Sequence, residues 1–158
     1  MFDHVAVAAP RLRDLLPLYQ DLLGGRYVFG ADTPRVGFRF CQLGFANGAR
    51  IELMEPLAGS PFFDSFFRRV GAAGGLHHLT FKVPDIERAL AALDERGYPV
   101  VGVHLDNPSW REAFLHPKQA NGVLVQIAQG GDSPPGADLT IEDLLAGRGA
   151  GGTGVPSP

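Results

Sequence analysis

Two segments of this chain share one pattern of apolar and polar positions, in which a short apolar run opens with histidine and closes with proline. His4–Pro10 reads HVAVAAP, and His78–Pro84 reads HLTFKVP, 74 positions further along the chain. Alternating or continuous apolar runs of this length are typical of strands that bury at least one face. The repetition predicts two copies of one supersecondary unit in a single chain.

Apolar residues at helical spacing follow each of these runs, and glycines then end the pattern. The positions are Leu12, Leu15, Leu16, Tyr19, Leu22 and Leu23 before Gly24-Gly25, and Ile86, Leu90 and Leu93 before Gly97. We therefore expect each copy to continue with a helix. Phe62, Phe63, Phe66 and Phe67 also lie at helical spacing, and we expect them in the core rather than at a dimer interface.

Further strand-like runs come after each expected helix. They cover 36–43 and 50–54 in the first copy, and 100–105, 112–116 and 123–128 in the second. The spacing of 74 also places Phe40 on Phe114 and Ala46-Asn47-Gly48 on 120–122, which predicts a tight Asn-Gly hairpin in both copies. The sequence thus predicts an α+β fold. Two tandem βαβββ repeats, at about 1–57 and 75–129, would form a curved mixed sheet around a central site with the helices outside.

The C-terminal segment differs in composition from the repeats. Residues 130–158 are rich in glycine, proline and serine, a composition that favours a flexible tail. Within the tail, Thr140 can cap a short helix that has Asp143 in its first turn. We expect that helix to fray rather than to dock on the repeats.

Composition narrows the possible functions. The chain has 158 residues, 45% of them hydrophobic, which is enough for one domain with an ordinary core. Its net charge is −3 and it has no run of Lys or Arg, so we expect no nucleic-acid partner. Cys41 is the single cysteine, which excludes an internal disulfide and a thiolate-rich zinc site. Because no segment has the pattern of a secretory signal or a membrane span, we expect a cytoplasmic location and no membrane partner.

The repeat also aligns four side chains that can bind a metal. His4 corresponds to His78 and Glu52 to Gln126, so each half offers one imidazole and one oxygen donor. Alone, each residue is more simply explained as a packed or surface residue, but their common spacing favours one divalent metal ion: cobalt, zinc, nickel, manganese or ferrous iron. Neighbouring strand side chains face opposite ways, so only one of His77 and His78 can reach the site, and the repeat selects His78.

The motifs at these positions resemble the vicinal oxygen chelate superfamily, which includes glyoxalase I, extradiol dioxygenases, bleomycin-resistance proteins and methylmalonyl-CoA epimerases. The resemblance is greatest to the epimerases and covers residues 2 to about 129. It rests on the runs Asp3–Val7, Ile51–Leu57, Gly74–Leu79, Phe114–Lys118 and Gly122–Gln126. It implies paired βαβββ units and a homodimer. It also implies an isomerase or lyase whose metal chelates two substrate oxygens, as in an acyl-CoA, and stabilises an enolate.

One residue departs from the epimerase pattern. The position matched by Gln126 is ordinarily a Glu that binds the metal and transfers protons, whereas an amide can bind metal but cannot act as a general base. Glu112 and His116 lie on one face of the same expected strand and are the candidate replacements, although His116 precedes Pro117 and also fits a strand-end turn. The alternative function is a non-catalytic protein that sequesters a small molecule between the halves, as bleomycin-resistance relatives do.

Overall fold

The computed structural model describes residues 1–131 and 140–148, so the remainder of the expected flexible tail, 132–139 and 149–158, lies outside the described residues. The elements are β1 (Phe2–Ala8), the 3-10 turn η1 (Leu12–Asp14), the π-helix η2 (Pro17–Leu22), β2 (Arg26–Thr33), β3 (Phe38–Gly44), β4 (Arg50–Pro56), α1 (Asp64–Val70), β5 (Gly75–Lys82), α2 (Ile86–Asp94), β6 (Val100–His104), β7 (Trp110–Leu115), β8 (Leu124–Gly130) and α3 (Ile141–Leu145).

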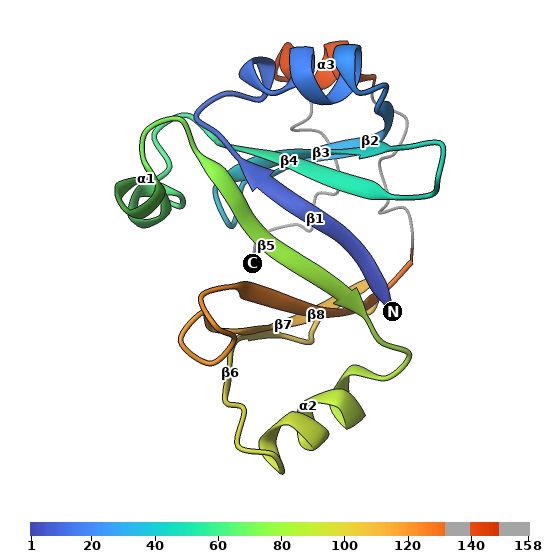
Figure 1. Cartoon of the computed structure of the whole chain (residues 1–158), viewed down its shortest axis with the longest axis vertical. Helices are drawn as coiled ribbons and strands as arrows, with labels where there is room; N and C mark the ends of the chain where they lie inside the picture. The colour runs from blue at the N-terminus through green and yellow to red at the C-terminus, as the bar shows by residue number, and fades with distance from the viewer. Residues whose placement is uncertain (132–139, 149–158) are drawn as a thin grey trace, which may run out of the picture.

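All eight strands belong to one curled mixed sheet in the order β2-β3-β4-β1-β5-β8-β7-β6. Strands β1 and β5 run antiparallel at its centre, and each is flanked by a parallel partner, β4 or β8. Figure 1 shows β1 and β5 side by side, with β2, β3 and β4 on one side and β6, β7 and β8 on the other. The predicted α+β fold of two βαβββ units in a curved sheet is therefore confirmed. The sequence predicted β6, as a strand-like run at 100–105, but gave no range for β2.

Alternation along the strands divides the side chains between two faces of the sheet. His4 and Ala6 of β1 face the same side as Glu52 of β4 and His78 of β5, because Ala6 is in register with both. We call this side the inner face. Val7 and Leu53 occupy the opposite, outer face, where they belong to an apolar core cluster.

Two short helical turns, rather than one continuous helix, cover the outer face of the first half. Leu12 of η1 is fully buried in the outer cluster, and Tyr19 of η2 packs against it. Proline at position 17 has no N–H to donate, so the chain restarts as a separate turn with Pro17 in its first position. The expectation of one regular helix across this segment was therefore wrong, because the chain forms two separate helical turns.

The C-terminal helix α3 docks on the same outer cluster, which corrects the expectation that it frays. Thr140 and Asp143 form a reciprocal capping box, and Leu144 is 0% exposed in the outer core. Gly30 of β2 makes the close approach possible, because a Cβ at that position would lie 2.7 Å from Leu144 Cδ2. Thr140 and Asp143 supply the capping that the sequence indicated, and the buried leucine supplies the anchor.

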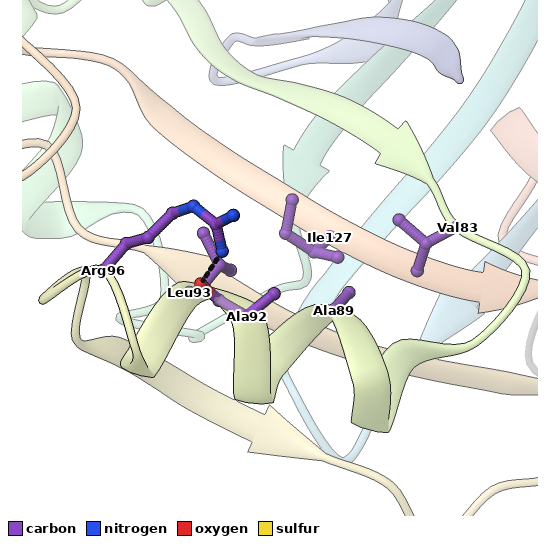
Figure 2. Close-up of a pocket in the computed structure, with 6 residues that line it drawn as sticks. All are labelled: Val83, Ala89, Ala92, Leu93, Arg96 and Ile127. Carbon is purple, nitrogen blue, oxygen red and sulfur yellow. Dashed lines mark hydrogen bonds between the residues drawn. The ribbon is translucent and has the colours of Figure 1, made fainter.

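Helix α2 covers the outer face of the second half. Asp85 caps its first turn by accepting a hydrogen bond from Arg88 N at 3.0 Å. Figure 2 shows its apolar face above Ile127 of β8, with Arg96 folded back to bond Ala92 O, and the residues shown line an open apolar hollow of about 390 Å³. No helix in the described part of the chain is long and apolar enough to span a membrane.

The two hairpins are not equivalent, which corrects the predicted alignment of Phe40 with Phe114. In the first half Gln42 is in register with Glu52, ten positions later, whereas in the second half Phe114 is in register with Gln126, twelve positions later. The second connection, 116–123, is longer and is not a tight hairpin. In the sheet, Phe114 is therefore equivalent to Gln42, and Glu112 to Phe40.

Docking of α3 predicts a specific stability effect. Leu144→Ala should lower the free energy of unfolding by about 2–4 kcal/mol, because it leaves a cavity in the outer cluster. Urea denaturation would measure the change, and Leu22→Ala, which truncates a side chain that is 76% exposed, is the matched control with an expected change within about 0.5 kcal/mol. Equal stability of the two variants would contradict a docked α3.

Candidate metal centre

Three of the four predicted donors converge at the centre of the inner face. His4, Glu52 and His78 each offer a ligand atom, and these atoms lie within 4.8 Å of one another. They come from the adjacent strands β1, β4 and β5, so the seam between the two halves runs through the cluster. Two imidazoles and one carboxylate at this spacing form a suitable set for one divalent ion.

His4 is oriented by a carboxylate behind it. Its Nδ1 lies 2.7 Å from Asp3 Oδ2, and its Nε2 lies 3.7 Å from Glu52 Oε2. The hydrogen bond to His4, together with Lys82 nearby, lowers the pKa of Asp3 despite partial burial. Asp3 therefore stays ionised, and by accepting a hydrogen from Nδ1 it would leave Nε2 of His4 to bind a metal ion.

His78 is oriented by its own neighbour through an irregularity in β5. The register between β1 and β5 shifts between Ala6 and Val7, which leaves His77 without a partner across the strand. The Nδ1 atoms of His77 and His78 then lie 2.8 Å apart, so one ring donates to the other. If His78 Nε2 is a metal ligand, His78 Nδ1 carries the hydrogen and His77 accepts it. His78, as predicted, is the histidine of this pair that joins the cluster, and the bulge adds a contact from His77 that the sequence did not indicate.

The electrostatics of the cluster favour an ion. Burial raises the pKa of Glu52, although His4 opposes that shift, and burial together with His77 and His4 moves the pKa of His78 well below its usual value. His78 is thus neutral, and its buried Nε2 has no hydrogen-bond partner among the described residues. A buried lone pair beside a buried carboxylate is an unsatisfied arrangement that a divalent cation completes.

Gln126 lies beside the cluster, where Thr80 and Glu112 hold its side-chain amide. Thr80 Oγ1 lies 3.0 Å from His4 Nε2 and donates to Gln126 Oε1 at 2.6 Å, while Gln126 Nε2 donates to Glu112 Oε2 at 2.6 Å. Trp110 Nε1 donates to the same Glu112 oxygen at 2.8 Å. Because Glu112 can only accept when ionised, it fixes the amide with Oε1 toward the cluster.

The two tentative catalytic residues lie in different places. Glu112 is on β7, faces inward with Gln126 and lies near enough to Glu52 to raise its pKa. His116 lies beyond the end of β7, is exposed, and accepts a hydrogen bond from Lys118 N at 3.2 Å. The structure therefore brings Glu112 to the metal cluster and does not bring His116 there.

Gln42 is a site residue that the sequence analysis missed. It is buried opposite Glu52, donates to Glu52 Oε2 at 3.4 Å and lies 3.5 Å from His4 Nδ1. Its Oε1 has no hydrogen-bond partner among the described residues. The spacing of 74 sets Gln42 against His116, which lies away from the cluster, whereas the longer second hairpin makes Phe114 its equivalent in the sheet.

Helix α1 closes the inner face on the side of the first half. Phe63 and Phe66 are buried against Ala6 and Met54, and their rings lie 5.2 and 4.9 Å from the His77 ring. This confirms the expected core role for these two phenylalanines. Burial among them, with Arg69 nearby, lowers the pKa of His77 to about 4, so His77 is neutral and can accept a hydrogen bond.

Comparison with known proteins agrees with this geometry. Residues 3–114 match the family model described as the glyoxalase/bleomycin resistance protein/dioxygenase superfamily. The chain belongs to this superfamily. Its curated relatives include an ethylmalonyl-CoA/methylmalonyl-CoA epimerase of Cereibacter sphaeroides, 36% identical over 80% of this chain and 96% of that protein. The mitochondrial methylmalonyl-CoA epimerase of Dictyostelium discoideum is 30% identical over 80% of this chain and 76% of that protein.

Solved structures give the same grouping. A methylmalonyl-CoA epimerase from Mycobacterium tuberculosis superposes with a TM-score of 0.71 and 28% identity, covering 82% of this chain and 87% of that one. A hypothetical protein from Bacillus halodurans superposes with a TM-score of 0.73 and 28% identity over 85% of this chain and 96% of that one. The expectation of an enzyme of the isomerase type, similar to these epimerases, is confirmed.

The role of His77 in orienting His78 can be tested by metal binding. His77→Phe keeps an aromatic ring against Phe63 and Phe66 but removes the Nδ1 acceptor, so affinity for Co²⁺ should fall about 10–100-fold. Titration of metal-free protein would measure it. The matched control is His104→Phe on the exposed edge strand β6, which should bind Co²⁺ as the wild type does. Unchanged affinity in His77→Phe would remove His77 from the site.

Proposed function

We propose that this chain is a metal-dependent isomerase that moves the proton on the carbon next to the thioester of an acyl-CoA. His4, Glu52, His78 and Gln126 would hold the ion, and Glu112 would exchange the proton. The observation that carries the proposal is the hydrogen bond of 2.6 Å between Gln126 and Glu112. This bond holds the Glu112 carboxylate directly beside Gln126, at whose position the epimerases that the chain resembles ordinarily have a Glu.

A divalent ion held by these four residues would polarise the thioester oxygen and lower the energy of the enolate. The protein residues do the rest. Asp3 and His77 fix the two imidazoles, Thr80 and Glu112 fix the amide of Gln126, and the phenylalanines of α1 exclude water on one side. A preorganised site of this kind stabilises charge that develops in the transition state.

Glu112 has the geometry of a general base. Both of its hydrogen bonds from described residues, from Gln126 and Trp110, end on Oε2, so Oε1 is left to accept a proton. The side chain is only partly buried, whereas Glu52 is enclosed within the metal cluster. The two carboxylates would therefore have separate tasks, since Glu52 would hold the ion and Glu112 would exchange the proton.

The names of the relatives support the substrate class. The Cereibacter protein is named for ethylmalonyl-CoA and methylmalonyl-CoA, so short branched dicarboxylic acyl-CoA esters are the first substrates to test. The identity of the metal and assembly as a homodimer stay predictions. Sequestration of a small molecule without catalysis is the alternative, and the absence of a Glu at position 126 is the observation that favours it.

The decisive experiment measures exchange of the α proton. Wild-type protein loaded with Co²⁺ should incorporate deuterium from solvent into methylmalonyl-CoA or ethylmalonyl-CoA. Glu112→Gln should slow exchange about 10²–10⁴-fold with metal content unchanged, because it removes only the base. Exchange is followed by mass spectrometry, and metal content by plasma mass spectrometry on the same samples.

Two further variants define the outcome. Glu95→Gln, an exposed substitution of the same type after α2, is the matched control and should leave exchange unchanged. Gln126→Glu, combined with Glu112→Gln, should restore part of the lost rate by returning a base to β8. If Glu112→Gln exchanges as fast as the wild type, Glu112 is not the base. If metal-loaded wild type exchanges neither substrate, sequestration becomes the better function.

A further inference from the structure

A small pocket at the edge of the second half is not used by the proposed reaction. It has a volume of about 290 Å³ and lies where the β7–β8 connection passes the start of β6. We call it the edge pocket, and its lining residues are Pro99, Val101, His116, Lys118 and Gln119. About 290 Å³ is roughly the volume of ten water molecules in the liquid, which suits a phosphate group and its neighbours.

The edge pocket continues the inner face that holds the metal centre. Val101 is in register with Phe114, and Phe114 with Gln126, so these three side chains form one row across β6, β7 and β8. Phe114 also packs edge-on against His78, with ring centroids 6.4 Å apart. At about 4.8 Å between strands, Val101 lies roughly 10 Å from Gln126 along this row.

The polar lining of the edge pocket consists of hydrogen-bond donors. Lys118 contributes an exposed ammonium group. His116 Nδ1 accepts the hydrogen bond from Lys118 N, so Nε2 is the ring nitrogen that carries a hydrogen and can donate. Gln119 adds an amide that can donate, and Pro99 and Val101 provide an apolar floor. Clustered donors with one fixed cation are the chemistry that binds phosphate oxygens.

The row from Val101 to Gln126 and the donors of the edge pocket together indicate which ligand would bind there. We propose that the edge pocket binds phosphate groups of the coenzyme tail of the substrate, with Lys118 and His116 as the contacting residues and Phe114 and Val101 supporting the arm between phosphate and thioester. This rests on the proposed acyl-CoA substrate and assigns its entry to the second half of the sheet. The first half is closed by Phe63 and Phe66 of α1.

The larger hollow under α2 does not compete for this role. It is lined by Val83, Ile127 and residues of α2, and Ile127 points away from the inner face because it alternates with Gln126 and Ala128. A ligand there could not reach the metal centre along the sheet. Arg96, which lines that hollow, is therefore a useful control cation on the opposite face.

Binding of coenzyme A itself tests the proposal apart from catalysis. Calorimetry at low salt should give tighter binding of coenzyme A than of pantetheine, which lacks the phosphates. Lys118→Ala and His116→Ala should each weaken coenzyme A binding about tenfold and leave pantetheine binding unchanged. Arg96→Ala should change neither. Added salt should weaken the wild type more than Lys118→Ala, because less charge attraction remains in the variant.

The outcomes separate this proposal from the proposed function. The Glu112→Gln variant should bind coenzyme A as the wild type does, whether or not the wild type exchanges a proton. Equal affinity for coenzyme A and pantetheine, or coenzyme A binding that is insensitive to both Lys118→Ala and His116→Ala, would overturn the phosphate site. Binding of adenosine diphosphate as tightly as coenzyme A, with the same dependence on Lys118, would overturn its role in the substrate site and make it a free-nucleotide site.

Discussion

Antiparallel pairing of β1 with β5 is the contact on which the rest of the molecule depends. Each half of the chain provides one imidazole at the start of its first strand, and only this pairing brings His4 and His78 together. It also sets Thr80 opposite His4, with Thr80 Oγ1 3.0 Å from His4 Nε2, and Thr80 in turn donates to Gln126 of the second half. Neither half alone would form the cluster, because β1 and β4 belong to the first half and β5 to the second.

Much of this could be predicted from the sequence, because duplication constrains positions that lie far apart. The common spacing identified His4, Glu52 and His78 without any knowledge of the pairing, since equivalent residues of a two-fold arrangement meet at its axis. The same reasoning failed where the halves differ. The longer second hairpin shifted β7 by two residues, so the spacing set Gln42 against His116 instead of Phe114, and Phe40 against Phe114 instead of Glu112.

Other features depend on contacts that composition and spacing do not encode. The bulge at His77 arises from the local register of two strands and turns a side chain that alternation directs away into a neighbour of the metal cluster. Docking of α3 depends on Leu144 filling the space left above Gly30, and a Gly- and Pro-rich composition around a five-residue helix gives no sign of that fit. Local patterns predicted the strands other than β2 and the positions of the helical segments, and tertiary packing decided their roles.

The shift of β7 gives the site an asymmetry with a chemical consequence. On β3, Gln42 is in register with the donor Glu52, and Phe40 lies two residues before it. On β7, Phe114 is in register with the donor Gln126, and Glu112 lies two residues before it. The second half therefore places its carboxylate beyond Gln126, one hydrogen bond away from the donors.

This arrangement also determines the net charge that a metal ion and its four donors would have. Two neutral imidazoles, a neutral amide and the single carboxylate of Glu52 would leave a divalent ion with one net positive charge, whereas a second carboxylate in the set would neutralise it. A net positive centre stabilises an enolate oxygen more strongly. A carboxylate that is not bound to the ion also keeps its lone pairs for a proton. With Glu112 as the proposed base on β7, the two tasks that a single Glu at position 126 would combine would be separate, and the amide of Gln126 is still held by Thr80 and Glu112.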